Sequence, residues 1–433
     1  MMKKIISLLF MFQFIGSIGV SWAGYVIHGS TVVLETEFTK SDMLNALTIL
    51  KNTESSLMTE ITKFQNDISK NRSEQAILSD LLDYPFGPSL TIKPNREFSS
   101  DSFIHKPLAV DAAISTNSAD YVKNLVKQIA DNFGVANVNI NQFTPAIFIV
   151  PATQPTVRVR NWDRNDPGGF NFPPLQDKWE NVPLPDNFTA ASGTDQEAVI
   201  YQPSTGKVWE FWKMQLVGAG SNITSSSCGL VGEWGARWGG RMDSVSTNPG
   251  YFLTEGGDWH TTTGVKYGTT ATGLAFLGGI MTIEEQQRGV INHAIGISLV
   301  NVLNYPRWAF PANRSDGVTV STNVLPEGAR LRFPAGLDLD AINMHPYARM
   351  IAKAVQKYGM FVWDKAGAVS FRAENPANQY PAGNPYTKVG GILGCPNGAS
   401  EPDCWADSHT YGNGGALRGF PFSQLQVLEL EFN

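Results

Sequence analysis

Residues 273–300 read GLAFLGGIMTIEEQQRGVINHAIGISLV, an apolar run with a helix signal in its middle. Thr282 stands three residues before Glu285, the spacing of a capping box in which each residue satisfies a backbone amide near the start of a helix. Glu284 adds negative charge near the same helix start. The pattern predicts a helix that begins after Thr282 and runs to about His293. A buried strand follows in the sequence HAIGISLV.

His293 stands at the change from this helix to the strand, and two interpretations of it remain open. A histidine at such a position commonly binds backbone groups at the helix end and serves only the core. It could instead act as an acid or base in a site. The sequence leaves both roles possible.

On both sides of residues 273–300, the sequence predicts mostly strands, with helices between them. The sequence EAVIYQPSTGKVWEFWKMQLV predicts a hairpin over 197–217, and GARLRFP and MFVWD predict further strands. Helices are predicted over 118–134 and 338–359, each followed by a glycine stop. The chain has 41 glycines and 25 prolines, a composition that favours many turns. We therefore expect a mainly β fold with α decorations, a jelly-roll or concanavalin-like β-sandwich spanning 101–433.

The first 100 residues differ from the rest. Two lysines, an apolar stretch and small residues at 21 and 23 predict a signal peptide over 1–23, cleaved after Ala23. No later apolar run is long enough to span a membrane, so we expect a secreted or periplasmic protein. Residues 24–100 are predicted to form an N-terminal helical segment and linker. Apolar residues at alternating three- and four-residue steps within 40–70 allow self-association through a coiled coil or packing against the chain's own domain.

Charge and cysteine content exclude several function classes. The chain has 33 basic and 39 acidic side chains; without Lys3 and Lys4, 31 basic residues face 39 acidic ones, a formal charge of −8. This balance argues against nucleic acid as a partner. Cys395 and Cys404 could close a small loop as a disulfide, which leaves Cys228 over. Their spacing is not that of a metal site, and neither a phosphate-binding loop nor a dinucleotide motif is present, so we expect no metal and no cofactor.

Five blocks in a fixed order resemble a family of secreted bacterial proteins of uncharacterised function. The blocks are VWEFWKM, TATGLAFLGGIMTIEEQQRGVINHAIGISL, RWAFPANRSDG, LPEGARLRFPAGLDLD and ARMIAKAVQKYGMFVWDKAG, within residues 143–374. The resemblance implies a shared exported globular domain and retains a histidine at 293, but it implies no reaction. This chain departs from the family pattern at Asn313-Arg314, where relatives often carry a histidine, and in a long insertion over 218–268.

Tryptophans and charged side chains are concentrated between residues 209 and 259. Sugar rings stack on aromatic faces and their hydroxyls pair with charged groups, so this mixture is typical of a carbohydrate cleft. Tryptophans are also common core residues of β-sandwiches, and this alternative stays open. In VWEFW, strand alternation places Glu210 on the same face as Trp212.

These observations lead to two hypotheses from different classes. In the first, the protein binds and possibly cleaves a carbohydrate polymer of the cell wall or the extracellular space, as a glycoside hydrolase or a polysaccharide lyase. Its expected catalytic residues are Glu210, Asp364 and His293. Its expected substrate-binding residues are Trp212, Trp238, Arg330 and Tyr358. In the second, the protein is a noncatalytic adhesin or structural surface protein assembled through its N-terminal helix.

Overall fold

The computed structural model describes residues 25–28, 31–34, 98–161, 172–216, 232–252, 254–255, 264–377, 379–381, 383–388, 391–393 and 415–433. The chain divides into two compact units, Met1–Pro85 and Phe86–Asn433. In the first unit, the strands β1 (Tyr25–His28) and β2 (Thr31–Leu34) form an antiparallel hairpin, which the sequence did not predict. The signal peptide, the 40–70 helix and the three cysteines lie outside the described residues.

The second unit is mainly β, as expected, and its largest sheet has six strands. Their order is β17 (Gln426–Val427), β14 (Arg330–Arg332), β15 (Met360–Lys365), β13 (Ile295–Leu299), β16 (Ser370–Arg372) and β3 (Asn137–Asn139). β13 and β15 run parallel, and the connection between them contains β14 and then the helix α8 (Pro346–Tyr358), which leads directly into β15. The other central pairings, β14 with β15 and β13 with β16, are antiparallel.

A second sheet has the strand order β10 (Trp238–Met242), β7 (Lys207–Trp212), β6 (Ala198–Gln202) and β4 (Ile147–Ile149). β6 and β7 form the predicted hairpin, and β4 pairs with β6 in parallel. Jelly rolls consist of antiparallel strands, whereas both larger sheets here are mixed. The coarse expectation of a mainly β fold is confirmed, but the jelly-roll or concanavalin-like topology is not.

Smaller elements complete the unit. A three-stranded sheet contains β5 (Val159–Asn161), β9 (Trp234–Ala236) and β8 (Gln215–Leu216), and β11 (Thr254–Glu255) pairs with β12 (Val265–Lys266). The remaining α-helices are α4 (Ser118–Asp131), α5 (Pro173–Lys178), α6 (Phe276–Gly279) and α7 (Ile283–Gln287). Short 3-10 turns occupy Val245–Thr247, Gly415–Leu417 and Phe422–Gln424. No helix in the described ranges combines the length and apolar character needed to span a membrane.

Two of the predicted helices are shorter than expected. The capping box of Thr282 and Glu285 is present, but α7 ends at Gln287 rather than near His293. Gly289 has φ +70°, a left-handed conformation that turns the chain out of the helix. α8 begins at Pro346 rather than 338, with the His345 side chain accepting from the Tyr347 amide at its start.

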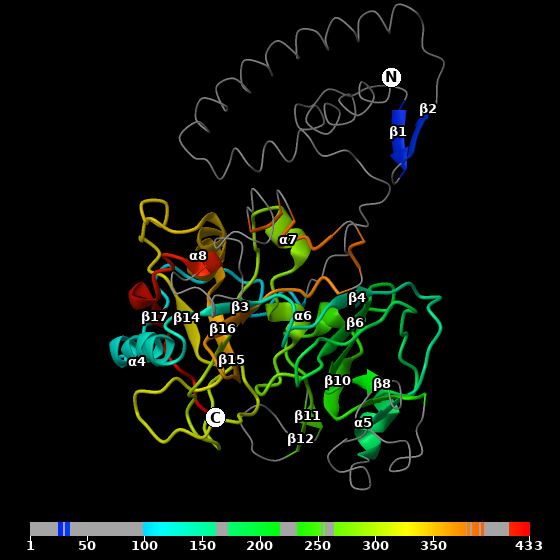
Figure 1. Cartoon of the computed structure of the whole chain (residues 1–433), viewed down its shortest axis with the longest axis horizontal. Coiled ribbons are helices and arrows are strands. Elements are labelled where there is room, and N and C mark those ends of the chain that lie inside the picture. Colours follow the sequence, from blue (N-terminus) through cyan, green and yellow to red (C-terminus); the bar gives the residue numbers. More distant parts are fainter. Residues whose placement is uncertain are drawn as a thin grey trace, which may run out of the picture. The chain divides into compact units, whose positions relative to one another are not determined.

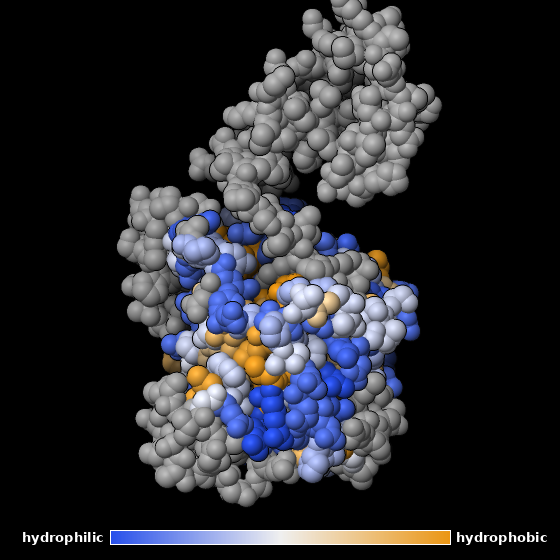
Figure 2. Space-filling model, turned by 90° about the vertical axis from the view of Figure 1, so that its right-hand side faces the viewer, coloured by the Kyte–Doolittle hydropathy of each residue, from blue (hydrophilic) through white to orange (hydrophobic). Residues whose placement is uncertain are grey.

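The six-stranded sheet separates two hydrophobic cores. Ile295, Ile297 and Leu299 of β13 face a core shared with α4 and α8, and Phe361 and Trp363 of β15 face a core shared with α6 and the four-stranded sheet. Figure 1 shows α4 and α8 beside the six-stranded sheet and α6 between that sheet and strands β4, β6 and β10. The surface on the side of the four-stranded sheet carries an apolar area between hydrophilic residues (Figure 2).

An irregularity in β15 decides where one carboxylate points. Ile297 pairs with Val362 and Ser298 pairs with Asp364, so Trp363 is an extra residue, a β-bulge. Regular alternation would place Trp363 and Asp364 on opposite faces of the sheet. The bulge instead lets Asp364 pair with Arg372, whose guanidinium also lies over the Trp363 ring.

Candidate functional site

Glu210, the first of the predicted catalytic residues, lies in the core of this fold. The side chain is fully buried (0% exposed), and its carboxylate oxygens accept hydrogen bonds from the Phe276 amide (3.1 Å) and the Leu277 amide (3.0 Å) at the start of α6. Burial raises the pKa of Glu210 to about 8, and the two amides oppose that rise. Glu210 therefore holds α6 on the four-stranded sheet instead of lining a groove.

His293 is also buried, at 1% exposure, and its two ring nitrogens have partners within the chain. Nδ1 lies 2.8 Å from the carbonyl oxygen of Ala294, and Nε2 lies 3.3 Å from Glu285. Glu285 is the capping residue of α7, so His293 joins the strand β13 to the start of that helix. The core interpretation of His293 accounts for all of these contacts.

Glu374 does for α7 what Glu210 does for α6. Its carboxylate accepts a hydrogen bond from the Ile283 amide at 2.9 Å, and it is fully buried. We call Glu210 and Glu374 the helix-start carboxyls. Buried carboxylates at helix starts satisfy amides that have no partner within the helix, so both serve the fold.

The predicted substrate-binding pair Arg330 and Tyr358 is likewise part of the framework. Arg330 donates hydrogen bonds to the backbone carbonyl oxygens of Phe103 and Tyr358, and its guanidinium lies over the Phe361 ring. Tyr358 is buried at the end of α8. Neither residue is presented to a ligand in this arrangement.

Asp364 belongs to a cluster that sequence reasoning only partly found. Arg372 at the end of β16 donates from Nη1 to Glu197 (2.6 Å) and from Nη2 to Asp364 (2.8 Å). The side chains of Arg372 and Glu197 are 4% and 2% exposed, whereas Asp364 is 17% exposed. One buried guanidinium thus holds two carboxyl groups, of which Asp364 reaches solvent.

Both carboxyl groups have raised proton affinities. Burial raises the pKa of Glu197 to about 7 and that of Asp364 to about 6, and the positive charge of Arg372 opposes both shifts. The negative charge of Asp195 raises both values further. Oε2 of Glu197 is buried and makes no hydrogen bond in the described part of the chain. We call Asp195, Glu197, Asp364 and Arg372 the Arg372 cluster.

Two tryptophans of the four-stranded sheet lie beside this cluster. Trp212 and Trp238 are direct cross-strand partners and both are half-buried. The indole nitrogen of Trp212 donates to Asp195 at 3.2 Å, with Lys213 and Arg237 over its ring. Trp238 stacks on Tyr267 at a centroid distance of 6.3 Å. From the predicted set, Asp364 belongs to the cluster, Trp212 contacts it through Asp195, and Trp238 lies opposite Trp212 on the next strand. The other four residues have their partners elsewhere in the unit.

The backbone is unusual where the cluster meets Trp212. Gln196, between the two acids, has φ +44°, and Lys213, after Trp212, has φ +56°. The segments just before β6 and just after β7 are joined here by two backbone hydrogen bonds. The Lys213 amide donates to the Asp195 carbonyl oxygen, and the Met214 amide donates to the Gln196 carbonyl oxygen. Left-handed residues other than glycine cost free energy and are often found at functional sites.

Sequence reasoning missed Asp195, Glu197 and Arg372. The signal available was the sequence TDQEAVIYQ, in which two acids stand two residues apart immediately before a buried strand. Arg372 in the apolar strand SFR was a second signal, because a buried arginine requires partners. Neither pattern says which acids meet the arginine.

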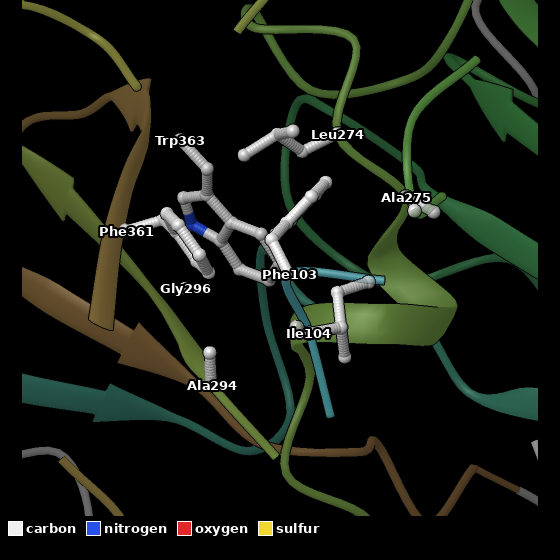
Figure 3. A pocket seen from close by; sticks show the side chains of 10 residues that line it. Phe103, Ile104, Leu274, Ala275, Ala294, Gly296, Phe361 and Trp363 are labelled. Carbon is white, nitrogen blue, oxygen red and sulfur yellow. The ribbon is translucent and has the colours of Figure 1, made fainter. Parts of the chain in front are cut away.

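A small apolar cavity lies elsewhere in the core, between α6 and β15 (Figure 3). It has room for about one water molecule, and apolar side chains line it. Trp363 occupies the middle of this region, packed on Gly279 and Gly296, where an added Cβ would lie 2.6 Å and 2.1 Å from its ring. These glycines admit the indole, and the cavity is too small for a substrate.

The described residues contain no group of three or more histidine, cysteine, aspartate or glutamate side chains arranged to hold a metal ion. No family model matches the chain, and no curated protein or solved structure is detectably similar to it.

Proposed function

We propose that this is an exported protein that binds a carbohydrate polymer and cleaves it at the Arg372 cluster. The observation that carries the proposal is the pairing of Asp364 and Glu197 on one buried guanidinium, with Asp364 reaching solvent and Asp195 of the same cluster bound to the half-buried Trp212. Aromatic rings beside carboxyl groups suit sugar rings and their hydroxyls.

In the proposed reaction, Asp364 is the general acid. Its pKa of about 6 leaves a usable protonated fraction near neutral pH, and it donates this proton to the oxygen that leaves the glycosidic bond. Asp195, held by the Trp212 indole, is the second carboxylate. It either attacks the anomeric carbon or takes a proton from the water that does so.

Glu197 and Arg372 tune this acid without touching the substrate. When Glu197 is protonated, the charge of Arg372 acts mainly on Asp364 and favours its ionised form. When Glu197 is ionised, the two carboxylates share one cation, and Asp364 holds its proton more tightly. We therefore expect turnover to follow apparent pKa values that belong to the pair.

The test is a polysaccharide-digestion and glycan-binding screen with the full chain, Asp364→Asn and Asp195→Asn. Asp131→Asn is the matched control, because Asp131 is an exposed partner of Lys127 on α4. Loss of an acid–base group is expected to lower kcat by about 10²- to 10⁴-fold while binding persists.

Three outcomes would redirect the proposal. Binding without turnover by the wild type would leave a carbohydrate-binding protein without catalysis. Turnover that survives Asp364→Asn would remove this residue from the reaction. Neither binding nor turnover would favour the second hypothesis, a structural surface protein assembled through residues 40–70.

A further inference from the structure

Arg314 holds one segment of the chain by its backbone. Its guanidinium donates to the carbonyl oxygens of Lys266 (2.7 Å), Gly268 (2.8 Å), Thr270 (2.5 Å) and Ala271 (3.0 Å). Four of the five N–H groups of one side chain thus bind four carbonyls within six residues. A planar fork of donors is required for this, and a lysine ammonium cannot reproduce it.

The segment 266–271 contacts both halves of the proposed site. At one end, the Lys266 carbonyl accepts a hydrogen bond from the Trp238 indole at 3.3 Å, and the Gly268 amide donates to Gly239, the residue after Trp238. At the other end, the hydroxyl of Thr272, which follows Ala271, donates to the carbonyl oxygen of Trp363 at 2.8 Å and so binds the residue before Asp364. The Ala271 backbone lies close enough to the Asp364 carboxyl to lower its pKa. The carbonyls bound by Arg314 include both end residues of this segment.

We propose that Arg314 is a positioning residue that fixes Trp238 and Asp364 relative to each other through segment 266–271. The proposal rests on the function proposed above for the choice of these two residues, but the coupling itself is a property of the ligand-free protein. Arg314 acts on Trp238 and Asp364 indirectly, by holding the four backbone carbonyls of segment 266–271.

The charges around Arg314 keep it protonated in this role. Burial lowers its pKa to about 10, and the negative charges of Asp364, Glu327 and Asp316 oppose that shift. A pKa near 10 keeps the guanidinium charged at neutral pH. Its four hydrogen bonds are therefore charge-assisted, which makes them stronger than bonds from a neutral donor.

The experiment measures the ligand-free protein. The Asp364 carboxyl is followed by NMR titration of ¹³C-aspartate-labelled full-length protein, with its resonance assigned from Asp364→Asn. Arg314→Lys keeps the positive charge but removes the planar set of N–H donors that binds the four carbonyls. We expect the Asp364 pKa to rise by roughly half to one unit as the Ala271 backbone moves away from this carboxyl. In Arg314→Gln the rise is larger because the positive charge is lost as well.

Arg349→Lys is the matched control. Arg349 of α8 also donates to backbone carbonyls, those of Leu339 and Ile342, but contacts neither Trp238 nor Asp364 in the described hydrogen bonds. It should leave the Asp364 pKa unchanged even if it lowers stability. Tryptophan fluorescence, compared with Trp238→Phe, should change in Arg314→Lys and not in Arg349→Lys.

An unchanged Asp364 pKa in a folded Arg314→Lys protein would overturn the proposal, whatever its melting temperature. A shifted pKa in a protein that cleaves no polysaccharide would keep the positioning role and reject the proposed function. If the variants turn over substrate, Arg314→Lys should shift the basic limb of the pH–kcat profile to higher pH, because the general acid Asp364 then keeps its proton longer. Added guanidinium ion should partly reverse the corresponding shift in Arg314→Gly.

Discussion

The helix-start carboxyls and the Arg372 cluster are both buried acidic groups, but they differ in their partners. Glu210 and Glu374 accept hydrogen bonds from backbone amides at the starts of α6 and α7, and both are fully buried. In the cluster, Glu197 and Asp364 share one side-chain cation, one Glu197 oxygen makes no hydrogen bond in the described residues, and Asp364 reaches solvent. Backbone partners indicate a role in folding, whereas a shared cation with access to solvent allows chemistry.

The largest effect is expected from Arg372→Leu. Removing the guanidinium leaves Glu197 and Asp364 without their cation, which should lower the free energy of unfolding at pH 8 by about 3–5 kcal/mol. At pH 5 the loss should be smaller, because both carboxyl groups are then protonated. Urea unfolding at the two pH values measures this difference.

Arg160→Leu is its control, since the pair of Arg160 with Glu233 is exposed and should contribute about 0–1 kcal/mol. Equal losses at pH 5 and pH 8 for Arg372→Leu would mean that the cluster is held by packing rather than by charge.

Glu210→Leu should have the next largest effect on stability and none on function. Two buried amides at the start of α6 lose their acceptors, at a cost of about 2–4 kcal/mol. Glu210→Gln should cost less, because one carbonyl oxygen can still accept. The measurement is urea unfolding, with Glu284→Leu as the control, because the half-buried Glu284 of α7 pairs with the exposed Arg288. Loss of polysaccharide turnover in folded Glu210→Gln would return Glu210 to the site.

A smaller effect is expected in the pH dependence of stability. The folded-state pKa of Glu197 is about 7, above its ordinary 4.5, so the folded protein binds this proton more tightly than the unfolded chain does. Its stabilising contribution is complete below pH 4.5 and is lost as the pH rises through 7. Glu197→Gln should therefore reduce the fall in unfolding free energy between pH 4.5 and 7 by about 2 kcal/mol.

The same titration separates the two regions. Glu210 has a folded-state pKa of about 8, so its contribution to stability is also lost as the pH rises. Glu210→Gln should therefore flatten the plot of unfolding free energy against pH up to a higher pH than Glu197→Gln does. Parallel curves for wild type and both variants would contradict the raised pKa values.

The smallest effect is expected from His293→Asn. The variant weakens the contacts of His293 with Glu285 and the Ala294 carbonyl and should cost about 1–2 kcal/mol in thermal or urea unfolding. Turnover per folded molecule should stay at the wild-type value. A fall in turnover without a change in stability would place His293 in the reaction.

Local patterns in the sequence predicted local structure well. The capping box of α7, the hairpin of β6 and β7 and the amphipathic helices α4 and α8 all follow from periodicity and capping, although α8 begins eight residues later than predicted. The length of α7 was wrong because Gly289 ends the helix. The parallel pairing of β13 with β15 depends on how a long connection packs, which no short-range pattern reports.

The site could be predicted only in part, for a geometric reason. Strand alternation correctly placed Glu210 and Trp212 on one face, but that face is the buried one at Glu210 and becomes half-buried only at Trp212. Asp364 lies in the predicted strand MFVWD, whereas its partner Arg372 comes from β16, which β13 separates from β15 in the sheet. A sequence shows which acids exist but not which of them share a cation.

The extra residue in β15 has a consequence for how the carboxylate of Asp364 is specified. Before Trp363, the side chains of β15 alternate between the two faces of the sheet in one register. From Asp364 onward this alternation is shifted by one residue. The bulge lets Trp363 fill the core beside α6 and lets its sequence neighbour Asp364 reach Arg372 on the same side of the sheet. Strand register, as much as residue identity, therefore specifies this carboxylate.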